Sequence, residues 1–122
     1  MYSVDFMDQV GARPATFQTS VAFSETDIIS VKEMIAARVK SEYGKIRDWD
    51  SLDPVRLAIY GDHPQVTHDD LEIVIKRALS AFDKRQFLLF VDGHQCAQLE
   101  EVVRLKSASK VKFLRITPLK GG

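Results

Sequence analysis

The sequence predicts an α+β domain in which a mixed sheet packs against helices. Two alternating apolar runs around a Gly/Pro loop open the chain and predict an antiparallel hairpin. Two later segments repeat apolar residues at helical spacing. Further strand-like runs follow the second of these segments, so strands and helices do not alternate strictly. This mixed order favours an α+β sheet covered by helices.

The hairpin is predicted from period-two alternation. Tyr2, Val4 and Phe6 alternate with polar residues, as in a half-buried strand. Gly11 and Pro14 then supply turn residues. Four residues of the second run are expected to face one way: Phe17, Thr19, Val21 and Phe23.

A helix is predicted to follow Ser30, because Glu33 lies three residues later in the capping-box pattern. Its apolar residues recur at helical spacing, with Met34 beside them: Ile28, Val31, Ile35 and Val39. Three charged residues are expected on its solvated side: Arg38, Lys40 and Glu42. Gly44 is expected to end the helix.

The middle of the chain predicts a loop, a strand and a second helix. Residues 45–54 have the composition of a loop, and Val55 to Gly61 has that of a short buried strand. Thr67 is expected to cap the next helix. The clearest helical stripe in the chain follows: Leu71, Val74, Ile75, Ala78, Leu79 and Phe82.

The last third predicts a strand, a turn, a return strand and a final strand. Phe87 to Val91 is the first of these strands, and Asp92-Gly93 supplies the turn. Residues 94–99 are expected to return, and 100–105 to form a short helical turn. In the final strand, Val111 and Phe113 face one side while Leu114 and Ile116 face the other. Pro118 should end strand pairing near Thr117.

Composition narrows the class of partner. The chain has 122 residues, suited to a single domain over 1–122, with 17 basic and 17 acidic residues. This balance predicts protein partners, with no nucleic acid and no membrane surface. Cys96 is the one cysteine, which favours a reducing, cytoplasmic location. The longest apolar run, Phe87 to Val91, is too short to span a bilayer.

The end of the chain resembles ubiquitin and its relatives. An apolar strand leads into a Gly turn, the step HQCAQL, a short turn, and a last strand that ends in LKGG. The hairpin and the helix that opens with SVKEMIAARV also fit. The resemblance implies a β-grasp fold, a mixed sheet with a crossover helix and the last strand beside the first. It covers residues 2–43 and 87–122, and leaves 44–86 as an inserted segment with an additional helix. VRLAIYGD is an alternative counterpart of the family's strand and Gly turn.

The resemblance implies a protein modifier that is itself no enzyme and needs no cofactor. In this family an adenylating enzyme activates the terminal carboxylate with ATP. The acyl group then passes to a conjugating enzyme and to a target-protein lysine, from which a protease removes it. The long insert favours a bacterial member of the family. Two alternatives remain: a sulfur carrier with a terminal thiocarboxylate, and a non-covalent ubiquitin-like binding module.

The residues expected to carry this chemistry lie at the end of the chain. Gly121 and Gly122 have no side chain, so their backbone fits a narrow active site and leaves the carbonyl carbon open to attack. Leu119 and Lys120 precede them in a flexible tail over 118–122. Pro118 departs from the family pattern and predicts a dedicated partner enzyme.

Leu114 and Ile116 are candidates for an exposed apolar patch that binds partner proteins. The alternative is that the inserted helix covers this patch.

Other candidate sites are weaker. His94 and Cys96 are two residues apart, but they lack the further ligands of a zinc site, and a half-buried cysteine is the simpler interpretation. Three aspartates, Asp48, Asp50 and Asp53, lack the pattern of a calcium loop. We therefore expect no metal site.

Overall fold

The computed structural model describes residues 2–23, 28–46, 52–61 and 70–116. Within these ranges the chain is a mixed α+β structure with a five-stranded sheet, a two-stranded ladder and three helices. The elements are β1 (Tyr2–Val10), β2 (Thr16–Phe23), β3 (Ile28–Ser30), α1 (Val31–Glu42), α2 (Pro54–Tyr60), α3 (Leu71–Asp83), β4 (Leu88–Val91), β5 (His94–Cys96), β6 (Val102–Arg104) and β7 (Lys110–Arg115).

The five-stranded sheet has the order β2-β1-β7-β4-β5. Its central pair, β1 and β7, is parallel, and the other neighbours are antiparallel. The last strand of the sheet therefore lies beside the first. The second sheet is the short antiparallel ladder of β3 and β6.

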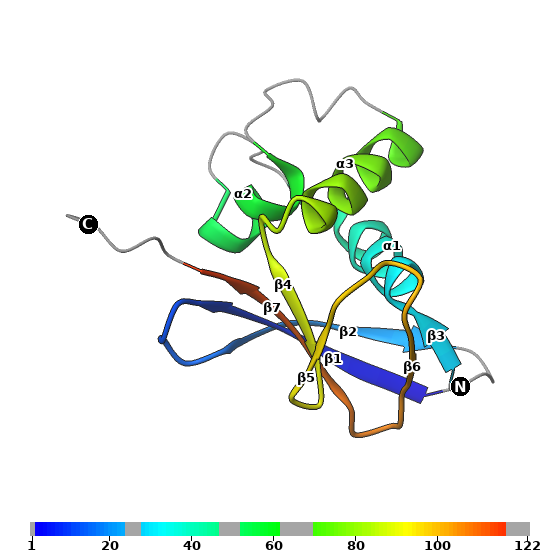
Figure 1. Cartoon of the computed structure of the whole chain (residues 1–122). Coiled ribbons are helices and arrows are strands. Elements are labelled where there is room, and N and C mark those ends of the chain that lie inside the picture. The colour runs from blue at the N-terminus through cyan, green and yellow to red at the C-terminus, as the bar shows by residue number, and fades with distance from the viewer. Residues whose placement is uncertain (1, 24–27, 47–51, 62–69, 117–122) are drawn as a thin grey trace.

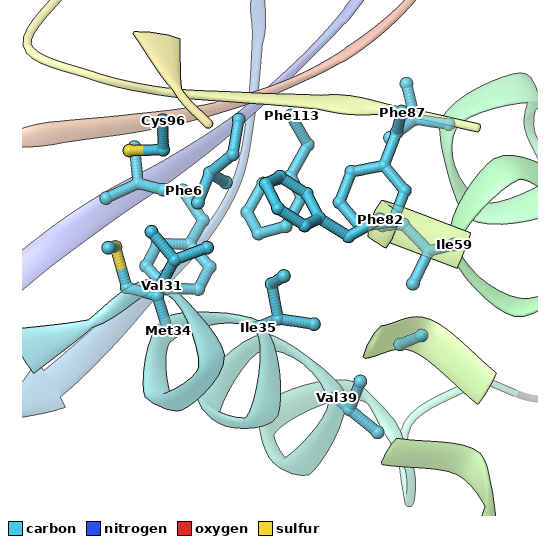
Figure 2. Close-up of a cluster of buried hydrophobic side chains, with 14 of the residues drawn as sticks. Phe6, Val31, Met34, Ile35, Val39, Ile59, Phe82, Phe87, Cys96 and Phe113 are labelled. Atoms are coloured by element: carbon cyan, nitrogen blue, oxygen red, sulfur yellow. The ribbon is translucent and has the colours of Figure 1, made fainter. Parts of the chain in front are cut away.

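The core lies between the sheet and the helices, all of which cover the same face of the sheet (Figure 1). Figure 2 shows side chains from both layers meeting there. Four buried rings form a continuous stack: Phe6, Phe113, Phe87 and Phe82. Successive ring centroids are 5.6, 5.7 and 5.8 Å apart. Such contacts contribute stability beyond the burial of apolar area alone.

Helix α1 begins as predicted. The hydroxyl of Ser30 accepts a hydrogen bond from the Glu33 amide and donates one to the Glu33 carboxylate, each at 3.1 Å. The first bond is the N-cap half of a capping box, and the second is a side-chain contact between the same two residues. Three residues of the predicted apolar stripe, Val31, Ile35 and Val39, are fully buried. Ile28 instead lies in β3 and is half-exposed, so its place in the helical stripe was wrong.

The hairpin is confirmed, but one predicted orientation is wrong. Phe6 pairs with Thr19, whereas Met7 pairs with Phe17, so Gln18 is an extra residue in β2. This bulge reverses the alternation beyond it. Phe17 consequently lies on the outer face and is 57% exposed, while Val21 and Phe23 pack against the core.

The predicted strand from Val55 to Gly61 is wrong, because this segment is helix α2. Asp53 caps the helix by accepting a hydrogen bond from the Arg56 amide at 2.9 Å, and Pro54 occupies the first turn. Pro at this position and Asp before it are helix-start signals. They were overlooked because a short apolar run in a two-turn helix has the same sequence pattern as a buried strand.

Helix α3 confirms the second helical prediction. Val74, Ala78 and Phe82 are its buried residues, and they join the core. The helix begins at Leu71 with Asp70 in the N-cap position. Thr67, the predicted cap, lies outside the described residues.

The strand, turn and return strand after α3 are confirmed as β4 and β5, with Asp92 and Gly93 between them. The predicted helical turn at 100–105 is wrong, because Val102–Arg104 is strand β6. Its neighbours bind the start of α1: Val31 donates its amide to the Glu101 carbonyl at 2.9 Å, and Lys32 donates to Leu99 at 3.0 Å. Tertiary pairing therefore overrides the local helical spacing. No helix in the described ranges is long and apolar enough to cross a membrane.

Candidate functional site

The candidate site begins where β7 ends. Arg115 is the last residue of the strand and pairs with Val10 of β1. Its carbonyl accepts a hydrogen bond from the Gly11 amide at 2.9 Å. Ile116 follows and is 60% exposed. The four predicted tail residues, Leu119, Lys120, Gly121 and Gly122, lie outside the described residues.

The Arg115 side chain attaches β7 to the inserted segment. Its Nη1 donates a hydrogen bond to the Pro54 carbonyl of α2 at 2.9 Å. Arg115 shares strand parity with Val111 and Phe113, which are buried beneath the helices. A positively charged side chain therefore occupies a position on the helix-covered face of the last strand.

Leu114 lies on the opposite face of the sheet from Val111 and Phe113, as predicted. It is half-buried and pairs with Leu88 of β4 and Gln9 of β1. Helix α3 packs on the other face, through Phe82 against Phe87. Helix α3, which was expected to cover this patch, therefore lies on the face of the sheet opposite Leu114.

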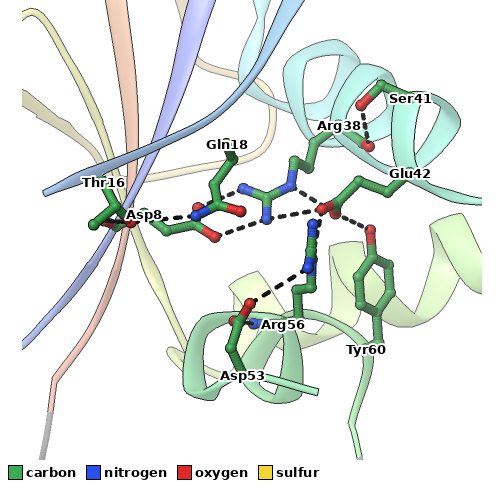
Figure 3. Close-up of polar contacts among 9 residues, drawn as sticks. All are labelled: Asp8, Thr16, Gln18, Arg38, Ser41, Glu42, Asp53, Arg56 and Tyr60. Atoms are coloured by element: carbon green, nitrogen blue, oxygen red, sulfur yellow. Dashed lines mark hydrogen bonds and ion pairs between the residues drawn. The ribbon is translucent and has the colours of Figure 1, made fainter. Parts of the chain in front are cut away.

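A buried ion cluster lies beside the candidate site (Figure 3). Arg38 of α1 is fully buried, and its guanidinium binds both oxygens of Asp8, at 2.6 and 2.9 Å. The same guanidinium binds both oxygens of Glu42, at 2.7 and 3.2 Å. The prediction that Arg38 and Glu42 face solvent was therefore wrong.

Helix α2 completes the cluster. Arg56 donates from Nε to Glu42 at 2.7 Å, and the Tyr60 hydroxyl donates to Glu42 at 2.6 Å. Glu42 thus accepts hydrogen bonds from two helices, while Arg38 reaches β1. Among the described residues, no buried side-chain nitrogen or oxygen lacks a hydrogen-bond partner. Full satisfaction is what makes a buried charge tolerable.

The pKa values follow this arrangement. Burial raises the pKa of Glu42, but the charges and hydrogen bonds of Arg38, Tyr60 and Arg56 outweigh it, so the pKa lies below its usual value. Burial raises the pKa of Asp8 by more than Arg38 lowers it. Burial and the neighbouring Glu42 carboxylate raise the pKa of Tyr60, so its hydroxyl stays a donor. Within the cluster, the environment therefore favours the charged form of Glu42 and the neutral forms of Asp8 and Tyr60.

Sequence reasoning missed this cluster because a charged residue in an amphipathic helix is normally exposed. Arg38 and Glu42 are four residues apart, which placed them as a pair on one helix face. Asp8 also continues the buried alternation of Val4 and Phe6. The position of Asp8 on the buried side of a strand was the sequence signal that a positively charged side chain would bind its carboxylate.

The Cys96 and His94 pair has no nucleophilic arrangement. Cys96 is fully buried, and burial together with Glu101 raises its pKa to about 11. The thiol is therefore protonated at neutral pH and is a poor nucleophile. His94 is exposed, and its Nε2 is 2.7 Å from the Glu101 carboxylate. Cys96 was predicted to be a plain half-buried cysteine, whereas in the structure it is fully buried.

The parts of the chain that the structure describes contain no group of three or more residues suited to hold a metal ion. Asp53, one of the three loop aspartates, caps α2. Asp48 and Asp50 lie outside the described ranges.

Comparisons with known proteins add no family to these observations. No protein-family model, no curated protein and no solved structure matches the chain.

Proposed function

We propose that this chain is a ubiquitin-like protein modifier with a β-grasp fold, activated at the carboxylate of Gly122 by an adenylating enzyme. One observation carries the proposal: the last strand lies parallel to the first at the centre of the sheet, and a sequence ending in Gly-Gly follows it. The hairpin and the crossover helix on one face support the β-grasp assignment. So does the β4–β5 pair between α3 and the last strand.

The composition of the Gly-Gly end supports a substrate role. Gly121 and Gly122 have no side chains, so their backbone can pass through a narrow active-site channel.

The proposed reaction needs no side chain of this protein. A carboxylate oxygen of Gly122 attacks the α-phosphate of ATP, forming an acyl adenylate and releasing pyrophosphate. A cysteine thiolate of the activating enzyme then attacks the acyl carbon and releases AMP. The acyl group moves to a conjugating-enzyme cysteine, and a lysine amine of a target displaces that thiol to form an isopeptide bond. A bacterial source, a cytoplasmic location and removal by a deconjugating protease belong to the same proposal.

Leu114 and Ile116 are proposed to contact partner proteins. Leu114 lies on the sheet face that the helices leave uncovered, and Ile116 is exposed at the base of the tail. Lys110 and Lys112 lie on the same strand and are expected to favour partners with acidic groups around an apolar centre.

Intact mass spectrometry tests the proposal. The chain is incubated with ATP and the adenylating enzymes encoded near it in its genome. We expect a thioester adduct that is cleaved by an excess of added thiol, to which the acyl group transfers. A chain lacking Gly121 and Gly122 should form no adduct but unfold at the same temperature, and Lys120→Ala serves as a control that keeps both glycines. An adduct that survives the deletion would refute the proposal, and replacement of a terminal oxygen by sulfur would identify a sulfur carrier instead.

A further inference from the structure

Strand β7 loses one of its two sheet neighbours just before it ends. Its pairing with β4 stops at Leu114 opposite Leu88, whereas its pairing with β1 continues to Arg115 opposite Val10. Among the described strands, β1 is therefore the sole neighbour of Arg115. The Gly11 amide binds the Arg115 carbonyl on this side at 2.9 Å. On the helix-covered face, the Pro54 carbonyl accepts a hydrogen bond from the Arg115 guanidinium at 2.9 Å.

The Pro54 carbonyl is a fixed anchor because α2 is tied to the rest of the domain. Asp53 caps the helix, and Arg56 binds the buried Glu42 carboxylate at 2.7 Å. Glu42 is bound by Arg38, which in turn holds Asp8 of β1. Arg115, the last residue of β7, is thus attached to β1 by its backbone and to α2 by its side chain.

Stability of α2 alone does not account for the contact. The N-terminal end of a helix carries a partial positive charge, which disfavours a nearby guanidinium. Asp53 already satisfies an amide of the first turn. The contact therefore couples the end of β7 to α2, so that each element restrains the other.

We propose that Arg115 is a positioning residue that fixes the end of β7 for the activating enzyme, with helix α2 as its support. This inference rests on the proposed function. An enzyme that binds the folded domain and receives Gly122 in a channel must bind the domain and the Gly-Gly end at the same time. If the end of β7 is already fixed before binding, the conformational entropy lost on forming both contacts is smaller. The insert thereby contributes to the choice of activating enzyme.

The kinetic test compares three variants in ATP–pyrophosphate exchange with the enzyme that activates the wild-type chain. Arg115→Ala should raise KM for the chain about tenfold with kcat nearly unchanged, as expected when one or two backbone positions must be ordered on binding. Arg115→Lys keeps a donor and should recover part of the loss. Arg13→Ala removes the same charge from the neighbouring turn, where its side chain is exposed, and should match the wild type.

A second measurement needs no enzyme. The Gly11 amide donates to the Arg115 carbonyl, so its hydrogen exchange reports on the end of β7. Arg115→Ala should accelerate exchange at Gly11 while leaving the amides of Val4 and Phe6 unchanged. Unchanged exchange at Gly11 would overturn the claim that the side chain fixes the strand end.

The two hypotheses fail in different ways. A wild-type chain that no adenylating enzyme activates refutes the proposed function, whatever the exchange result. An active wild type with an equally active Arg115→Ala variant refutes the positioning role and leaves the proposed function standing. A fall in kcat with unchanged KM would also refute positioning, because it would indicate a role in the chemical step.

Discussion

Two buried regions lie side by side under the helices, one held together by contacts between aromatic rings and the other by ion pairs and hydrogen bonds. One is the ring stack of Phe6, Phe82, Phe87 and Phe113, and the other is the ion cluster of Asp8, Arg38, Glu42, Arg56 and Tyr60. They touch, since the Arg38 guanidinium carbon lies 4.8 Å from the centre of the Phe113 ring. Rings attract without strict direction, so the stack can adjust to small changes. The ion cluster depends on matched donors and acceptors, so a missing member leaves a charge uncompensated.

This difference teaches how each helix is held. Apolar burial explains why α3 covers the sheet, because many side chains of suitable size would fill the same space. Helix α2 also buries Val55 and Ile59 in the core, but Arg56 and Tyr60 additionally bind one carboxylate, Glu42. The ion cluster therefore adds directional contacts to the apolar packing that holds α2.

The largest expected effect comes from Arg38→Ala. The change leaves Asp8 and Glu42 buried beside each other, with Arg56 as the remaining cation of the cluster. We expect a loss of about 3–5 kcal/mol in unfolding free energy, measured by denaturant titration. Lys40→Ala, on the exposed side of the same helix, should change it by less than about 0.5 kcal/mol. A loss below about 1 kcal/mol for Arg38→Ala would contradict the distinction between the two regions.

Arg38→Lys sharpens the comparison by keeping the charge. The guanidinium makes four contacts with two carboxylates, and an ammonium cannot reproduce this planar fork. We expect a loss of about 2 kcal/mol, because some carboxylate oxygens lose their partners. Full stability in the lysine variant would show that charge alone, without geometry, holds the cluster together.

Ile35→Val is the matched change in the apolar region. Ile35 is fully buried on the same helix, so the variant removes one methylene from the core. The expected loss is about 1 kcal/mol, smaller than that of Arg38→Lys, in the same titration. A larger loss than that of Arg38→Lys would mean that the apolar region is the less tolerant of the two.

The smallest expected effect is the response to acid. The lowered pKa of Glu42 contributes stability that is present above its usual value of 4.5 and is lost as the pH falls through the folded-state pKa. The raised pKa of Asp8 acts in the opposite direction, since protonation relieves its burial. The difference between the unfolding free energies measured at neutral pH and at about pH 3.5 should therefore be smaller for Glu42→Gln than for the wild type. Asp8→Asn should enlarge the difference, and Glu72→Gln, which is exposed, should leave it unchanged.

Sequence patterns predicted the elements whose burial is apolar and periodic. The hairpin, α1, α3, the β4–β5 pair and the faces of β7 were all identified, because their period sets which side chains reach the core. The capping box of Ser30 and Glu33 was identified for the same local reason.

Two elements were predicted wrongly, for different reasons. Val55–Tyr60 is too short for its period to separate helix from strand, so the neighbouring cap at Asp53 is decisive. Val102–Arg104 is a strand because it pairs with Ile28–Ser30, far away in the sequence. The ion cluster likewise joins Asp8 to Arg38 and Arg56, a combination that no local window contains. The tail, on which the proposed function depends, remains a prediction.

The extra residue in β2 affects how the chain meets copies of itself. β2 lies at the outer edge of the sheet, where its backbone groups offer a template for another strand. Gln18 interrupts the regular ladder and increases the local twist. A flat strand from a second molecule would stay in register along only part of this edge. The bulge thereby opposes edge-to-edge association between copies of this domain.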